Sequence, residues 1–202
     1  MIKFFTNREV SKRLEINLSK WKRWSREFLP PDPLGGMQSG FARQYSPDDA
    51  FTVYFGGHLV ADLKFTIPET KQILTDLHTW FVEKGFYFDS RRNATVDESV
   101  EQLIKKYIIF IEREKDPGNA IAFLYTIRGI ISNESVIYSG VEIMKELYME
   151  SSIGLPPKNR ATLDMNIVKI VNITGVLNSF VARLNLNRSG YSALWSSNSN
   201  RS

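Results

Sequence analysis

The sequence contains no cysteine among its 202 residues, and only two histidines. The absence of cysteine excludes a disulfide framework, thiolate metal sites and a cysteine nucleophile, and it fits a reducing compartment. No apolar run approaches the ~20 residues that a membrane-spanning helix needs, and the first residues lack the apolar core of a secretion signal. We therefore expect a cytoplasmic protein with no membrane partner.

Patterns that carry catalysis or hold a cofactor are also missing. His58 and His78 lie far apart in the sequence without a companion pair of ligands, so they are expected to be structural. The glycine pairs at 35–36 and 56–57 lack the lysine and the strand–helix context of a phosphate-binding loop. The acidic residues within 112–116 are expected on a solvated edge. We expect neither an enzyme nor a cofactor or metal.

Positive charge, in contrast, is concentrated at one end of the chain. Residues 1–26 carry eight basic and two acidic side chains, a net charge of +6, whereas the formal net charge of the whole chain is +4. A cationic end on a near-neutral body indicates a polyanionic partner, and it favours nucleic acid over a membrane surface.

Within this basic end, residues 17–28 have the periodicity of a short helix. Leu18, Trp21, Trp24 and Phe28 fall on one side of it, and Asn17 suits the N-cap position. Polar and basic side chains occupy the other side and its flanks: Ser19, Lys20, Lys22, Arg23 and Arg26. The pattern predicts a helix with an aromatic inner side and a four-cation outer side.

Three capping boxes predict the starts of three further helices. In each, a hydroxyl side chain accepts from the N3 amide while the acidic N3 side chain reaches back to the cap. They begin at Thr6, Ser46 and Thr66. The helices are therefore expected at residues 7–14, 18–28, 47–64 and 67–84. The short connection between the first two is typical of a helix-turn-helix, and Gly56-Gly57 indicates a close helix crossing or a kink.

The segment from Leu29 to Tyr45 changes character. Its prolines end the preceding helix, and Gly35-Gly36 and Ser39-Gly40 are turn formers. Residues 41–45 alternate as a short strand would. A helix-turn-helix followed by such a glycine-tipped hairpin is a winged helix-turn-helix, whose second helix can enter the major groove while the wing follows the phosphate backbone.

Residues 4–75 resemble the MerR-type winged-helix DNA-binding domain. The resemblance rests on five ordered blocks: F-F-T-N-R-E-V-S-K-R-L-E-I, N-L-S-K-W-K-R-W, L-P-P, S-G-F-A-R-Q-Y-S-P-D-D and L-K-F-T-I-P-E-T-K-Q-I-L. It implies that a recognition-helix arginine and a wing arginine beside an aromatic meet DNA, which here are Arg23, Arg43 and Tyr45. Unlike many members, this chain does not continue through residues 86–97 as a long dimerising helix.

These elements predict a set of DNA-contacting residues. Ser19, Lys20, Arg23 and Arg26 would meet base edges and flanking phosphates. The backbone contacts, which position the protein without reading sequence, are expected from Lys22, Gln38, Ser39 and Arg43.

The second half of the chain is predicted to form a smaller α+β part. We expect a helix from Asp97 to about Lys106 and a helix at 141–150. Strands are expected at 107–111 and 120–128, although a continuous helix to Glu114 also fits the spacing. Further along, residues 153–160 are predicted to form a loop, residues 161–187 fit a strand or a helix, and the Ser- and Asn-rich tail from 189 is expected to be disordered.

The overall expectation is an α+β protein. Its parts are an all-α winged helix-turn-helix domain at 1–85, a linker at 86–96, a C-terminal α+β domain at 97–188 and a tail at 189–202. We expect a sequence-specific double-stranded-DNA-binding protein, a bacterial or phage transcriptional regulator, acting as a homodimer joined through residues 98–187.

Alternatives stay open at this point. Fold analogy alone adds a small-molecule or protein effector for the C-terminal part. An architectural or DNA-processing factor, such as an excisionase or a packaging adaptor, also fits the sequence, as does a protein-interaction module that does not use DNA.

Overall fold

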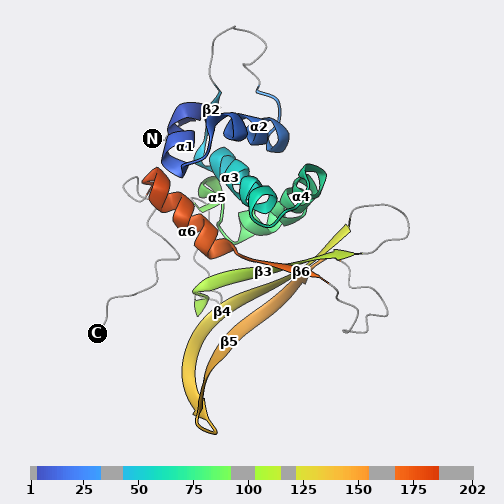
Figure 1. Ribbon diagram of the computed structural model, residues 1–202, viewed down its shortest axis with the longest axis vertical. Coiled ribbons are helices and arrows are strands. Elements are labelled where there is room, and N and C mark those ends of the chain that lie inside the picture. The colour runs from blue at the N-terminus through green and yellow to red at the C-terminus, as the bar shows by residue number, and fades with distance from the viewer. Residues whose placement is uncertain (1–3, 33–42, 92–102, 115–121, 155–166, 187–202) are drawn as a thin grey trace. The chain divides into compact units, whose positions relative to one another are not determined.

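The computed structural model describes residues 4–32, 43–91, 103–114, 122–154 and 167–186 (Figure 1). Predictions for the wing tip with Gln38 and Ser39, the turn at 116–119, most of the loop at 153–160 and the tail from 189 lie outside these residues. Helices and strands are both abundant, which confirms the α+β class.

The chain divides into two compact units. One comprises residues 1–95 and 177–191, and the other comprises 96–176 and 192–202. The C-terminal helix residues from 177 therefore belong with the N-terminal unit, whereas the sequence analysis assigned them to a separate C-terminal domain.

The first unit is mainly helical. Its elements are β1 (Phe5–Thr6), α1 (Asn7–Leu14), α2 (Leu18–Phe28), β2 (Gln44–Tyr45), α3 (Pro47–Ala61), α4 (Ile67–Glu83) and α5 (Phe88–Arg91), together with α6 (Ile173–Leu184) from residue 177. The predicted α1 and α2 are confirmed to the residue, and α3 and α4 end slightly earlier than expected. Strand β2 pairs antiparallel with β1.

Local side-chain chemistry sets the helix starts as predicted. Thr6, Ser46 and Thr66 each accept a hydrogen bond from the N3 amide, and the N3 carboxylate in each case accepts from the cap's own N–H. Asn17 Oδ1 accepts from the amides of Ser19 and Lys20, at 2.9 and 3.3 Å. Each cap satisfies amides that would otherwise lack an acceptor.

The glycine pair of α3 lies where α2 crosses it, which confirms the expected close crossing. A Cβ built on Gly57 would come within 2.3 Å of the Trp24 ring, and one built on Gly56 within 2.6 Å of the Phe28 ring. Both rings are therefore seated directly on glycine backbone. Trp24 is buried and Phe28 is half-buried, so the aromatic side of α2 faces the core as predicted.

Aromatic side chains from distant segments form the core of this unit. Phe51 of α3 packs edge-on against Phe81 of α4 and against Phe180 of α6, with ring centroids 6.3 and 5.4 Å apart. Phe86 and Phe88 are also buried. The beginning of the predicted linker at 86–96 is thus part of the core.

Two arginines hold α6 to α1. Arg183 Nη1 donates to the carbonyl oxygen of Leu14 at 2.9 Å, and Arg13 Nη1 donates to that of Leu184 at 3.0 Å. Each guanidinium satisfies a carbonyl at the other helix's C-terminus, where a positive charge is favourable. Arg13 is therefore engaged within the protein and is not one of the free cations of the basic end.

The second unit is a four-stranded antiparallel sheet in the order β5-β4-β3-β6 (Figure 1). Its strands are β3 (Lys106–Glu114), β4 (Ala122–Tyr138), β5 (Val141–Ile153) and β6 (Val168–Asn172). The predicted strand at 107–111 is confirmed as part of β3, and the strand predicted at 120–128 is confirmed from residue 122 on, as the beginning of β4. The alternative of a continuous helix to Glu114 is wrong. Segment 161–187, whose sequence fits either a strand or a helix, contains one of each: strand β6 followed by helix α6.

The predicted helix at 141–150 is wrong, because these residues form β5. Ser139 and Gly140 connect β4 to β5 with φ angles of 50° and 80°. A two-residue turn with positive φ at both positions matches the twist of a hairpin, and it pairs Tyr138 with Val141. Pairing with β4 satisfies the backbone of residues 141–150, and it outweighs their helical spacing.

Two further expectations in this unit need correction. The predicted helix cannot run to Lys106, because that residue begins β3. The solvated edge predicted for residues 112–116 is wrong for Glu112, which is 7% exposed. Strand β3 lies between β4 and β6, so Glu112 pairs with Leu124 on one side and with Val168 on the other and is not on an edge.

The glycine crossing yields a stability prediction. Alanine normally stabilises a helix interior relative to glycine by about 1 kcal/mol. We expect Gly57→Ala instead to lower the free energy of unfolding by about 1–3 kcal/mol, because the buried Trp24 ring cannot yield to the new methyl group. Gly56→Ala is the matched control and should cost less, since the half-buried Phe28 ring can swing outward. Urea titration of both variants would test this, and equal effects would contradict the assigned contact.

Candidate functional site

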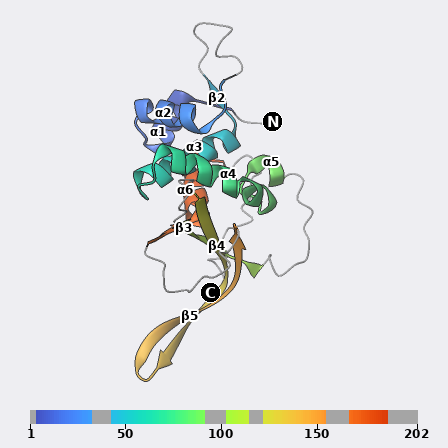
Figure 2. The ribbon, with the colours of Figure 1, turned by 90° about the vertical axis from the view of Figure 1, so that its right-hand side faces the viewer.

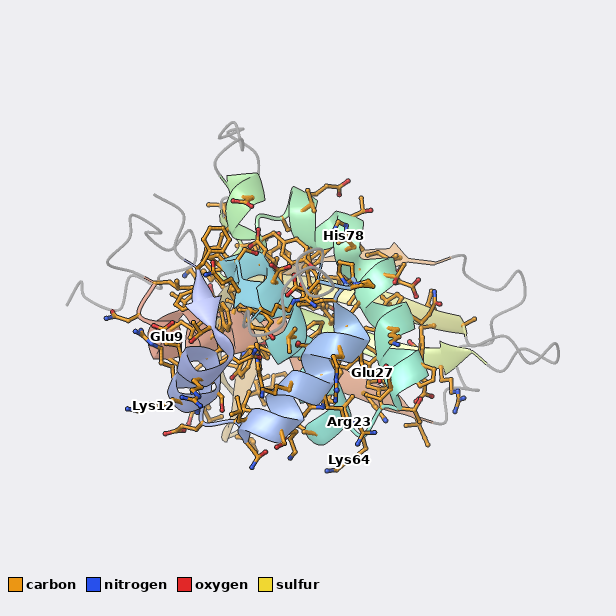
Figure 3. The ribbon with its side chains drawn as sticks, turned by 90° about the horizontal axis from the view of Figure 1, so that it is seen from above. Glu9, Lys12, Arg23, Glu27, Lys64 and His78 are labelled. Carbon is orange, nitrogen blue, oxygen red and sulfur yellow. The ribbon has the colours of Figure 1, made fainter. Side chains whose placement is uncertain are left out.

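The outer side of α2 presents a row of exposed polar and basic side chains. Ser19, Lys20, Lys22, Arg23 and Arg26 are all exposed. Seen from above, Arg23 and Glu27 project from α2 (Figure 3). The row is held outward because Trp21 and Trp24, on the opposite side of the helix, are buried at 0% and 7% exposure.

The cations of this row are mostly uncommitted. Among the described residues, Lys22, Arg23 and Arg26 form no ion pair or hydrogen bond, and the Lys20 ammonium lies 5.7 Å from the centroid of the Trp24 ring. Glu27, the one acidic residue of α2, is bound by Lys71 of α4 at 2.8 Å. The hydrogen bond from Lys71 and the positive charge of Lys71 lower the pKa of Glu27, and the charges of Arg23 and Arg26 add smaller effects in the same direction. Because the Glu27 carboxylate is paired with Lys71, the cations of α2 remain available to an anion from outside the protein.

Tyr45 joins three elements behind this row. Its hydroxyl donates to Asn7 Oδ1 of α1 at 2.7 Å and lies 2.8 Å from Ser25 Oγ of α2. Because its single proton goes to Asn7, the Ser25 hydroxyl is the donor in the second bond. The Tyr45 ring also packs edge-on against Trp21, with centroids 5.5 Å apart. Tyr45 is 1% exposed, so in the structure it supports the site from within.

Arg43, two residues before Tyr45, is positioned by this arrangement. Its guanidinium lies 5.8 Å from the centroid of the Tyr45 ring. It lines a groove of about 470 Å³ together with Lys22 and Arg26 of α2. Leu29, Pro30, Pro31 and Asp32 also line the groove. The groove thus collects three cations from two separate chain segments, an arrangement suited to a phosphate-bearing chain.

The nine residues predicted to contact DNA fall into three groups. Six of them are accessible in the first unit: Ser19, Lys20, Lys22, Arg23, Arg26 and the half-buried Arg43. Tyr45 is buried, and Gln38 and Ser39 lie outside the described residues. Asn7 and Ser25 complete the Tyr45 network, and sequence reasoning missed both, because neither lies within a motif that indicates a partner for a tyrosine hydroxyl.

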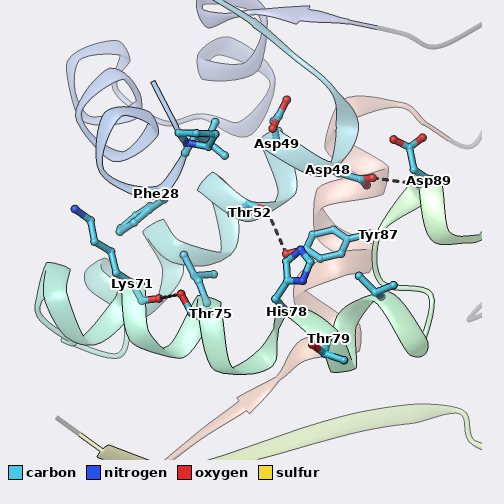
Figure 4. Close-up of a pocket in the computed structure, with 14 residues that line it drawn as sticks. Phe28, Asp48, Asp49, Thr52, Lys71, Thr75, His78, Thr79, Tyr87 and Asp89 are labelled. Carbon is cyan, nitrogen blue, oxygen red and sulfur yellow. Dashed lines mark hydrogen bonds between the residues drawn. The ribbon is translucent and has the colours of Figure 1, made fainter. Parts of the chain in front are cut away.

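A second cavity, of about 940 Å³, lies between the end of α2, α3 and α4 (Figure 4). On its wall the Tyr87 hydroxyl accepts from Thr52 at 3.4 Å, and Asp48 accepts from the amides of Phe88 and Asp89. Burial raises the pKa of Asp48, and those two amide bonds oppose the rise. The Asp48 carboxylate therefore serves as the cap of the short helix α5.

His58 and His78, which were expected to be structural, have separate partners in the structure. His58 pairs with Asp62 one turn along α3, and the His78 ring lies 5.4 Å from that of Tyr87. The described residues contain no group of three or more His, Asp or Glu side chains able to hold a metal ion.

No protein-family model matches the chain, and no curated protein sequence matches it. Within the described part of the chain, no helix is long and apolar enough to cross a membrane.

The Tyr45 network yields a prediction that separates support from contact. We expect Tyr45→Phe to lower the free energy of unfolding by about 1–3 kcal/mol, since it leaves the Ser25 and Asn7 groups without their partner. Tyr54→Phe on α3 is the control, because the Tyr54 hydroxyl has no hydrogen bond among the described residues. Thermal unfolding of the two variants would measure the difference. A Tyr45→Phe protein as stable as wild type would refute this role.

Proposed function

We propose that this protein binds double-stranded DNA in a sequence-specific manner through α2, and that it acts as a transcriptional regulator of the MerR-like winged type. The observation that carries the proposal is the exposed row of α2 with three cations free of internal partners. A helix about 11 residues long with one buried and one cationic side has the dimensions to lie in a major groove.

The geometry around α2 supports the proposal in two further ways. The connection from α1 to α2 spans Glu15–Asn17, and Glu15 adopts the left-handed conformation, with φ of 57°. The turn thus orients α2 sharply against α1, as in helix-turn-helix proteins. Arg43 precedes a strand held beside α1 and α2, which suits a residue that follows the phosphate backbone next to a recognition helix.

Individual roles follow from the position of each side chain. Arg23 is exposed on the outer side of α2, and its planar guanidinium suits bidentate contact with a guanine edge. Lys22, Arg26 and Arg43 share the groove and would meet phosphates. A single such helix covers too few base pairs for useful specificity, so the proposal includes a homodimer on an inverted repeat.

Alanine substitutions at neighbouring positions of α2 test these roles. After a preferred site is selected from random duplexes, Arg23→Ala should weaken specific binding by about 1–3 kcal/mol and relax the preference at one base position. Lys22→Ala should weaken binding about equally for all sequences and reduce the salt dependence, the slope of log K against log salt, by about 1.

Lys105→Ala is the matched control, since this exposed lysine belongs to the sheet unit and should leave DNA affinity unchanged. Fluorescence anisotropy at several salt concentrations measures all three variants. The proposal fails if the wild-type protein does not bind duplex DNA at low salt, or if Lys105→Ala weakens binding as much as the α2 variants do.

A further inference from the structure

The hairpin of β4 and β5 extends beyond the ends of β3 and β6 (Figures 1 and 2). Beyond the bulge at Ile131 it is a ribbon of only two strands, and residues 133–152 are exposed throughout. We call residues 132–149 the arm, counting Tyr148 and Met149, which pair with Ile130 and Gly129, as its base. A two-stranded ribbon is marginally stable alone in water, so an arm of this length needs a reason to persist.

The strand register assigns the arm's side chains to two faces. Directly paired residues share a face, and alternate residues of the unbroken β5 share a face. The buried Ile127 pairs with Ser151, so the odd-numbered residues of β5 continue the buried face of the sheet. The extra residue Ile131 shifts the alternation in β4 and adds its even-numbered residues to that face.

This face, which we call the apolar face, carries six exposed apolar side chains. They are 39–70% exposed and comprise Val136, Tyr138, Val141, Ile143, Leu147 and Met149. Near the middle, Glu134 and Lys145 pair across the strands, and among the described residues neither forms an ion pair. The apolar face therefore carries one charge of each sign and no net charge.

The opposite face differs in chemistry and already has partners. It carries Glu142 and Glu146 beside the exposed Ile137 and Met144, and Glu142 accepts a hydrogen bond from Ser135. At its base the Arg128 guanidinium lies 4.7 Å from the ring centroids of both Phe110 and Tyr148 and binds Glu150 at 2.7 Å. The arm residues of this face have a net charge of −2, from Glu142 and Glu146, whereas the apolar face is neutral.

We propose that the apolar face of the arm is the dimerisation surface, and that it packs face to face on the same surface of a second copy of this chain. A two-fold axis along the arm places each β4 opposite the partner's β5. Glu134 of one copy then meets Lys145 of the other, Val136 meets Ile143, and Tyr138 meets Val141. The arm as a whole carries three glutamates and one lysine, which argues against DNA or an anionic membrane as the occupant, because both would be repelled.

The inference rests on the homodimer of the proposed function but not on DNA binding. Sedimentation velocity of the full chain without DNA therefore tests it separately. We expect wild type to be dimeric, Ile143→Lys to be monomeric, and Met144→Lys, the adjacent position on the opposite face, to remain dimeric. Ile143→Lys should keep salt-dependent binding to DNA. A monomeric wild type, or equal effects of the two lysine variants, would overturn the proposal.

Charge exchange gives an independent readout that folding defects cannot mimic. Glu134→Lys and Lys145→Glu should each weaken the dimer by about tenfold or more, because each creates like charges across the interface. An equimolar mixture of the two variants, or the double variant E134K/K145E, should restore dimerisation. Single exchanges without effect, or a double variant no better than the singles, would refute the face-to-face arrangement.

Discussion

The seating of the α2 aromatic rings on the glycines of α3 is the constraint on which the first unit depends. With Trp24 against Gly57 and Phe28 against Gly56, the two helix backbones approach as closely as ring thickness permits. This contact fixes the rotation of α2 about its own axis. Arg23 and Arg26 therefore face outward because the buried side of the helix leaves no other orientation. An arrangement that presents cations to a partner thus follows from apolar packing on the other side.

Tyr45 fixes the position of the segment around Arg43, which has little secondary structure of its own. Strands β1 and β2 have two residues each, too few to fix the position of Arg43 by backbone pairing alone. The hydroxyl bonds to Asn7 and Ser25 tie β2 to both helices, and the edge-on packing on Trp21 makes the ring part of the core. A residue that the family resemblance placed beside DNA acts in the structure as the support for its neighbours.

Elements controlled by local chemistry could be predicted from the sequence, and those controlled by distant pairing could not. The three capping boxes and the Asn17 cap act within four residues, so their helix starts are correct. Residues 141–150 have helical spacing, but their structure is decided by pairing with β4 after the Ser139-Gly140 turn. The Ser139-Gly140 pair was the feature of the sequence that could have indicated a hairpin at this point. The burial of Tyr45 and the bulge at Ile131 depend on contacts that no short pattern reveals.

The bulge also explains why the arm suits a closed pair of copies. Without it, Val136 and Tyr138 would lie on the side of Glu142 and Glu146 and not beside Val141 and Ile143. A ribbon with two similar faces can stack on either side and grow without limit, which is the hazard of exposed strands. One face is apolar and neutral, whereas the other carries Glu142 and Glu146 among its apolar residues. The like charges of the second face oppose stacking, so the neutral face is the side that favours association. In the proposed dimer, a two-fold axis buries both apolar faces and turns outward two faces that each carry Glu142 and Glu146. These outward faces repel one another, so the proposed assembly stops at two.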